Sequence, residues 1–139
     1  MASTTTSLDI PRSPDHVWRL IGGFGSLPDW LPYIPQSELG EGGRVRRLTN
    51  QDGGVIVERL VAFDDAERRY SYAIEQAPFP VTDYLSTLTV HAVPGSPDAS
   101  RVEWSGSFTP VGVGDAEVEE LFHGIYADGL AALLTTVQG

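Results

Sequence analysis

The chain of 139 residues has no cysteine and only three histidines, and these shortages exclude several kinds of site. Without cysteine there are no disulfides, no thiolate metal ligands and no thiol nucleophile. His16, His91 and His123 lie far apart and share no metal-ligand spacing, so we expect no metal ion and no other cofactor. The sequence also lacks the GxSxG pattern that presents a nucleophilic serine.

Basic residues are scarce as well. Lys and Arg together number nine, against nineteen acidic residues, and the net charge is −10. Nucleic-acid binding needs a basic face that neutralises phosphates, and an anionic membrane surface attracts the same kind of face. We therefore expect neither nucleic acid nor an anionic membrane surface among the partners.

Long apolar runs are also missing, because none approaches the roughly 20 residues of a membrane span. The opening MASTTTSLDI has neither the basic nor the apolar region of a secretory signal. The expected location is therefore the cytoplasm, without membrane insertion. The content of 41% hydrophobic and 20% charged residues is typical of a globular protein, and no repeat or linker divides the chain. We expect a single domain over residues 1–139.

The strongest periodic pattern lies between Asp115 and Val137. Apolar residues recur there at three- and four-residue spacing, which predicts one face of a long helix. Asp115 is a candidate N-cap. Gly124 and Gly129 suit points where a helix approaches a sheet closely or leaves volume for a ligand. The apolar face comprises Val118, Leu121, Phe122, Ile125, Tyr126, Leu130, Leu133, Leu134 and Val137.

The rest of the chain predicts one strand, two short helices and then six strands. A strand over 3–10 precedes a helix that Ser13 caps and Gly22 ends, and a helical turn follows near 26–30. From Ser37 the pattern alternates, with turns at 40–43, 50–54, 64–68, 77–81 and 94–100 and prolines only between strands. Turns this short make neighbouring strands antiparallel, and the sheet has to curl around the long helix. The fold class is therefore α+β.

Alternation also predicts which side chains face the helix. On the last strand these are Val102, Trp104 and Phe108, and on the two strands before it the sets that begin at Tyr70 and Tyr84. The strand VIVERLVAF stays ambiguous, because the Ile56–Glu58–Leu60 set and the Val57–Arg59–Val61 set are equally apolar. Either Glu58 or Arg59 therefore faces inward.

Several stretches resemble polyketide cyclase/dehydrase-type proteins of the START-like (SRPBCC) superfamily. They are SLDIPRSPDHVWRLIGGFGSLPDWLPYI, VERLVAFDDAERRYSYAI, PFPVTDYLSTLTV, RVEWSGSFTP and GLAALL, so the likeness covers nearly the whole chain. The resemblance implies a birch-allergen-like helix-grip fold, in which seven antiparallel strands wrap a C-terminal helix with a cavity between them. It also implies that the Gly40–Gly43 hairpin acts as a lid. Lipid carriers, hormone receptors, aromatase/cyclases and chaperone activators share this fold, so fold alone does not give the activity.

The candidate binding residues are mainly aromatic, because phenol and indole groups combine an apolar body with a polar handle. They are Trp30, Tyr33, Glu58, Tyr72, Tyr84, Trp104, Phe122 and Tyr126, with Trp30 and Tyr33 expected at the cavity mouth. If Glu58 faces inward, it is either an ion-paired core group or a ligand or proton-transfer group with a raised pKa. If it faces outward, it forms a cross-strand surface salt bridge.

Three functions remain open. The first is a carrier or sequestering protein for a small, mostly apolar molecule such as a lipid, a polyketide or another aromatic. The second is a cyclase that uses the same cavity, with Glu58 or Tyr72 moving protons. The third is an interaction protein whose outer surface binds a partner. In each case we expect a monomer or weak dimer.

Overall fold

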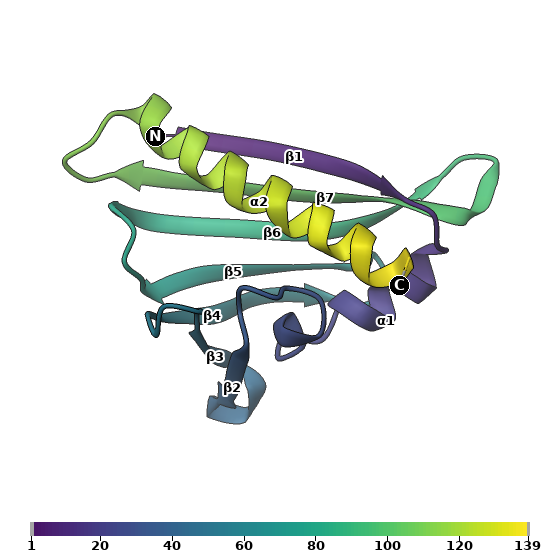
Figure 1. Cartoon of the computed structure of the whole chain (residues 1–139), viewed down its shortest axis with the longest axis horizontal. Helices are drawn as coiled ribbons and strands as arrows, with labels where there is room; N and C mark the ends of the chain where they lie inside the picture. Colours follow the sequence, from purple (N-terminus) through teal and green to yellow (C-terminus); the bar gives the residue numbers. More distant parts are fainter. Residues whose placement is uncertain (1, 139) are drawn as a thin grey trace.

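The structure is a computed structural model and describes residues 2–138. Its strands form one antiparallel sheet in the order β1-β7-β6-β5-β4-β3-β2, so every strand after β1 pairs with its neighbour in sequence and β7 closes back onto β1. The sheet curves around the long helix (Figure 1). The strands are β1 (Ala2–Ile10), β2 (Gln36–Gly40), β3 (Val45–Thr49), β4 (Val55–Asp64), β5 (Arg69–Gln76), β6 (Val81–Val93) and β7 (Ser96–Pro110).

Two short helical segments separate β1 from β2, as predicted. Helix α1 (Pro14–Ile21) begins where the Ser13 hydroxyl accepts a hydrogen bond from the His16 backbone N–H at 3.2 Å, and Pro14 occupies the first position. The 3₁₀ turn η1 (Leu27–Asp29) follows. Another 3₁₀ turn, η2 (Glu41–Gly43), joins β2 to β3. The predicted end of α1 is confirmed, because the Gly22 N–H closes its last turn on the Trp18 carbonyl.

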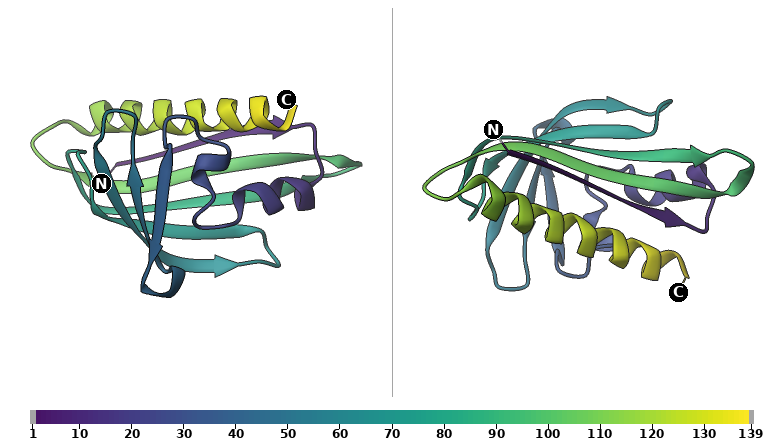
Figure 2. Two further views of the ribbon diagram at one scale, coloured as in Figure 1. Left: turned by 60° about the horizontal axis from the view of Figure 1, so that its bottom comes forward. Right: turned by 90° about the horizontal axis from the view of Figure 1, so that it is seen from above.

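Helix α2 (Asp115–Gln138) packs against one face of the sheet, as the right-hand view of Figure 2 shows. The predicted stripe is buried except at three positions: Ile125 and Leu134 are partly buried, and Leu121 is 39% exposed. Asp115 is the first residue of the helix, not the residue before it, so the predicted N-cap is wrong. Its carboxylate still lies at the positive end of the helix dipole.

The last hairpin differs most from prediction. The expected turn over 94–100 contracts to Pro94 and Gly95, and β7 already begins at Ser96. Gly95 has a φ of +77°, a conformation that a side chain would disfavour. Pro97 and Pro110 therefore lie inside β7, which corrects the expectation that prolines occur only between strands. Pro97 lies within an irregularity of the β6–β7 register, between Ser96 and Ser100, and Pro110 is the last residue of the strand, so neither interrupts regular pairing in its middle.

The predicted inward faces of β5, β6 and β7 are confirmed. Tyr72, Tyr84 and Trp104 are all at most 5% exposed and lie on the side of α2. On β4 the ambiguity is settled in favour of the Ile56–Glu58 set, while Val61 is 56% exposed. The predicted α+β helix-grip fold, with seven strands around a C-terminal helix, is thus confirmed.

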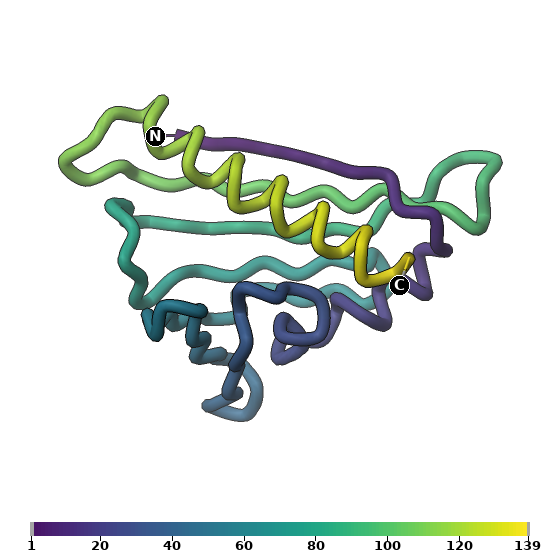
Figure 3. Tube along the Cα trace, in the orientation of Figure 1, coloured from purple at the N-terminus to yellow at the C-terminus, as the bar shows by residue number. Residues whose placement is uncertain are grey.

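The segment that follows α1 completes the wall opposite the sheet. In the Cα trace of Figure 3 this segment, in dark blue, passes close to α2 before it enters β2. The contact is direct, since the Tyr33 hydroxyl donates to the Ile125 carbonyl of α2 at 3.4 Å. Within residues 2–138, no helix is both long and apolar enough to cross a membrane.

Candidate ligand-binding site

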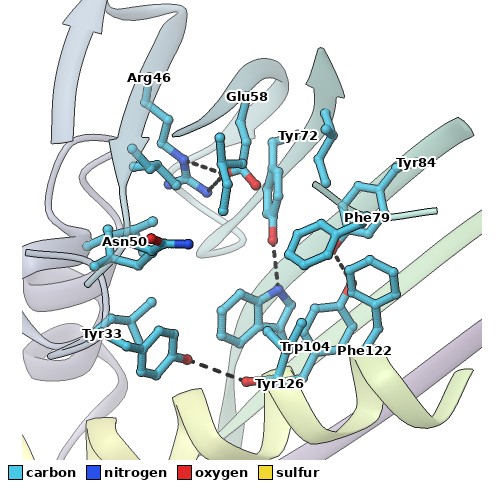
Figure 4. A pocket seen from close by; sticks show the side chains of 17 residues that line it. Tyr33, Arg46, Asn50, Glu58, Tyr72, Phe79, Tyr84, Trp104, Phe122 and Tyr126 are labelled. Atoms are coloured by element: carbon cyan, nitrogen blue, oxygen red, sulfur yellow. Dashed lines mark hydrogen bonds and ion pairs between the residues drawn. The ribbon is translucent and has the colours of Figure 1, made fainter. Parts of the chain in front are cut away.

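A cavity of about 170 Å³ lies between the curved sheet, the first half of α2 and the segment after α1 (Figure 4). Strands β3 to β7 supply its floor, and α2 and residues 27–34 cover it. Its lining is mostly apolar and aromatic: Leu27, Leu31, Tyr33, Ile34, Arg46, Leu48, Asn50, Ile56, Glu58, Tyr72, Ile74, Phe79, Tyr84, Trp104, Phe122, Ile125 and Tyr126.

The cavity brings together all but one of the predicted binding residues. Tyr33, Glu58, Tyr72, Tyr84, Trp104, Phe122 and Tyr126 all line it. Trp30 does not, and its predicted place at the mouth is wrong. It is 1% exposed and packs against Trp104, with 5.8 Å between the ring centroids. Trp30 is therefore part of the packing behind the cavity wall.

Glu58 faces inward and pairs with Arg46, a residue that the sequence analysis missed. The guanidinium Nε and Nη2 atoms lie 2.8 and 2.7 Å from the same carboxylate oxygen, Oε1. Arg46 is 1% exposed and Glu58 7%, so the ion pair is buried. Of the two orientations left open, the inward one is correct, and the carboxylate is ion-paired. Arg59 points outward instead, to Glu41 and Glu75.

Aromatic rings and a backbone carbonyl hold the Arg46 guanidinium. Its Nη1 donates to the Phe24 carbonyl at 3.1 Å and to the Tyr70 hydroxyl at 3.3 Å. The guanidinium carbon lies 4.2 Å from the Phe24 ring centroid and 4.7 Å from that of Tyr72, as in cation–π contacts. Although burial opposes the charged form, the neighbouring Tyr70 and Glu58 raise the pKa of Arg46 above its ordinary value. Arg46 is therefore a fixed cation.

Glu58 has one oxygen left for other contacts. Oε1 receives both bonds from Arg46, and within residues 2–138 Oε2 has no hydrogen-bond partner. Burial raises the pKa of Glu58, and the attraction of Arg46 only partly offsets this effect. Paired with the Arg46 cation, the carboxylate leaves Oε2 as an available hydrogen-bond acceptor at an otherwise apolar wall.

A hydrogen-bond network spans the other side of the cavity. The Trp104 indole N–H is shared between the Tyr72 hydroxyl at 3.1 Å and the Ser86 hydroxyl at 3.0 Å. The Tyr84 and Tyr126 hydroxyls bond to each other, and Figure 4 shows both rings beside Phe122. This network fixes the aromatic walls, because each ring is held at its polar end as well as by packing.

The cavity tyrosines stay neutral at ordinary pH. Burial raises the pKa of Tyr33 and of Tyr126 to about 12 in each case. Burial also raises the pKa of Tyr72 and Tyr84 well above the usual phenol value, and the nearby Glu58 carboxylate adds to the rise at Tyr72. These phenols can therefore donate hydrogen bonds but do not supply a phenolate base near neutral pH.

The two glycines of α2 have different surroundings. A Cβ on Gly129 would lie 2.6 Å from the Trp104 ring and 2.9 Å from the Tyr33 hydroxyl, so the helix approaches the sheet side closely there. A Cβ on Gly124 would have no neighbour within 4 Å. For Gly129 the predicted close approach of the helix to the sheet is therefore correct. Gly124 does not pack on the sheet and does not line the cavity.

A sequence signal for Arg46 existed. In the β3–β4 hairpin Arg46 pairs with Glu58, and the two residues are six positions on either side of Asp52, the centre of the predicted turn. Asn50, also missed, lines the cavity from this turn, and its Oδ1 accepts from the Gly54 N–H at 2.7 Å. No residue of 40–43 lines the cavity, and the lid implied by the resemblance stays a prediction.

Within residues 2–138, no three His, Asp or Glu side chains come together in an arrangement that would hold a metal ion.

This combination of a helix-grip fold and an interior cavity defines a START-like protein. The model of the family described as "Polyketide cyclase / dehydrase and lipid transport" matches residues 1–138. The chain therefore belongs to that family, and the superfamily expected from the sequence is confirmed. No curated protein matches the chain.

Solved structures of similar proteins agree with this assignment. The protein XoxI from Bacillus cereus is 63% identical, with 97% of this chain and 94% of that chain covered and a TM-score of 0.93. A Bacillus thuringiensis protein is 59% identical over 99% of this chain and 100% of its own, with a TM-score of 0.96. The Zhui aromatase/cyclase from a Streptomyces species is 18% identical over 97% and 90%, and its TM-score of 0.74 shows a common fold.

Proposed function

We propose that the protein is a single ligand-binding domain that carries or sequesters a small, mostly apolar molecule in the interior cavity. The main support is the cavity itself, whose aromatic walls enclose about 170 Å³ with only a few polar groups. Ligand sites generally combine such apolar walls with a small number of placed polar groups. The family description, which includes lipid transport, agrees with this proposal.

Native mass spectrometry after gentle purification tests the proposal. We expect a bound small molecule on the wild-type protein and its loss when a bulky side chain fills the cavity. Ile125→Trp is suitable, because Ile125 lines the cavity from α2 and is only partly buried. Leu121→Trp is the matched control, since Leu121 is exposed one turn earlier on the same helix.

Two results would contradict the proposal. One is a wild-type protein that takes up nothing even after exposure to a whole-cell extract of lipids and aromatics. The other is an adduct that Ile125→Trp and Leu121→Trp retain equally, because such a molecule binds outside the cavity.

An enzyme that transfers protons is the second candidate, and the free Oε2 of Glu58 favours it. A buried carboxylate with a raised pKa beside a bound substrate is a common arrangement for acid–base catalysis. The fold shared with an aromatase/cyclase is consistent with this role. If the protein turns over a ligand identified by mass spectrometry, Glu58→Gln should slow turnover by about 100-fold or more with little change in affinity. Equal turnover by Glu58→Gln and wild type would exclude Glu58 as the catalyst.

A further inference from the structure

We infer that the cavity selects a neutral, single-ring aromatic alcohol or phenol, whose hydroxyl group binds between Glu58 Oε2 and the Tyr72 hydroxyl. This inference rests on the proposed function, because it names the class of molecule that the same cavity holds.

The size of the cavity sets the first limit. Ligand pockets for drug-sized molecules usually have about 300–1,000 Å³, whereas an apolar cavity of about 150 Å³ holds one benzene ring. The cavity of this protein, about 170 Å³, therefore fits one ring with a short substituent. Fused multi-ring polyketides and long-chain lipids would extend beyond it.

The free hydrogen-bonding groups set the second limit. The Tyr84 and Tyr126 hydroxyls bond to each other, and the Tyr33 hydroxyl donates to a carbonyl of α2. The Tyr72 oxygen accepts from Trp104, but within residues 2–138 its own O–H has no acceptor. Glu58 Oε2 likewise has no donor among the described residues. Oε2 is thus an unpaired acceptor, and the Tyr72 O–H is the unpaired donor on the strand next to it, whereas the other free donors, the Asn50 amide and one hydroxyl of the Tyr84–Tyr126 pair, come from other elements.

These two groups face the same space. Glu58 and Tyr72 extend from neighbouring strands, β4 and β5, and both line the cavity; Figure 4 shows the Glu58 carboxylate beside the Tyr72 ring and the Tyr72 hydroxyl directed at the Trp104 indole. A ligand hydroxyl both donates and accepts, so it can satisfy Oε2 and the Tyr72 O–H together. An ether or a hydrocarbon would leave Oε2 buried without a donor, which is unfavourable.

Charge sets the third limit and excludes acids. Every Arg46 nitrogen already binds Glu58, a backbone carbonyl or Tyr70, and aromatic rings cover the guanidinium. A carboxylate ligand would therefore meet Oε2 and not the cation, and like charges repel in a site of low dielectric. The polar group of the ligand is accordingly neutral.

Two isomers test the role of the hydroxyl without any mutation. 4-Methylphenol and anisole have the same composition, but only the first can donate a hydrogen bond. In an NMR titration we expect 4-methylphenol to bind about 10- to 100-fold more tightly than anisole, as suits a hydrogen bond to a charged acceptor. We expect 2-naphthol, with a second ring, to bind more weakly than 4-methylphenol.

Variants then assign the preference to its residues. Tyr72→Phe removes one hydroxyl and leaves Ser86 as acceptor for the Trp104 indole, so the fold should persist. It should weaken the binding of 4-methylphenol by about 10-fold. Glu58→Gln should reduce the preference for the phenol, whereas Arg59→Gln on the outer face of β4 should not.

The outcomes separate this inference from the proposed function. Equal affinity for the two isomers, or tighter binding of 2-naphthol, would overturn the selectivity while the cavity remained a ligand site. Failure of all three probes to bind would also overturn it. The proposed function would then still be judged by the mass-spectrometric comparison of Ile125→Trp with Leu121→Trp.

Discussion

Replacing Arg46 by methionine removes the partner of a carboxylate that is 7% exposed. Methionine keeps an unbranched apolar side chain against the Phe24 and Tyr72 rings, so the main change is the loss of the cation and its hydrogen bonds. Breaking one side of a buried ion pair typically lowers the free energy of unfolding by about 3–5 kcal/mol. At about 2–4 °C per kcal/mol, the melting temperature should fall by roughly 6–20 °C.

The double variant Arg46→Met/Glu58→Leu separates the charge effect from the packing effect. Because the double variant buries no unpaired ion, we expect it to recover most of the free energy of unfolding that Arg46→Met loses. Arg59→Met is the matched control. It also breaks ion pairs of a β4 arginine, but these are on the surface, and stability should hardly change.

Urea denaturation at neutral pH, followed by circular dichroism, measures all four proteins. The loss in Arg46→Met should be smaller at pH 5, because the unpaired Glu58 can then take up a proton. The reasoning is refuted if Arg46→Met is no less stable than Arg59→Met, or if the double variant is as unstable as Arg46→Met.

Two further predictions concern pH and the helix glycines. Burial raises the folded-state pKa of Glu58 above 4.5, so its contribution to stability is complete below the ordinary pKa and is lost as pH rises through the folded pKa. Urea denaturation over a pH series should show wild type losing stability relative to Glu58→Gln as pH rises, and parallel curves would disprove this. Gly129→Ala should lower the free energy of unfolding by about 1–3 kcal/mol, because the new Cβ meets the Trp104 ring. Gly124→Ala should raise it by about 0.5–1 kcal/mol, because the site is open and alanine favours helix. Thermal unfolding of both variants measures these changes. If both substitutions raise the free energy of unfolding, or both lower it, the proposed difference between the surroundings of Gly124 and Gly129 is contradicted.

Much of the fold could be predicted because local signals agreed with one another. Ser13 and Pro14 begin α1 through their own chemistry, and alternation on β5 to β7 places the aromatic side chains on one face. The last hairpin was harder to predict. Its segment PGSPDAS has a turn-like composition, yet only Pro94 and Gly95 form the turn. Pairing of Ser100 with Ile10 and Ala92 extends β7 against this local preference.

The site was predictable to the extent that it depends on strand alternation. The orientation of Glu58 was not, because both faces of β4 carry apolar side chains and only the buried Arg46 distinguishes them. Recognising that pair required the hairpin register, which follows from a turn centred on Asp52. The position of Trp30 depends on how an irregular segment crosses the sheet, and no local pattern encodes that path.

An NMR measurement of contacts between bound 4-methylphenol and the protein tests the central claim most directly. The claim is that the interior cavity is the ligand site. The account predicts nuclear Overhauser effects from the ligand ring to the methyl groups of Leu48, Ile56 and Ile125, which line the cavity from two strands and from α2. Contacts only to exposed side chains such as Leu39 or Val61 would place the ligand on the surface and contradict the account.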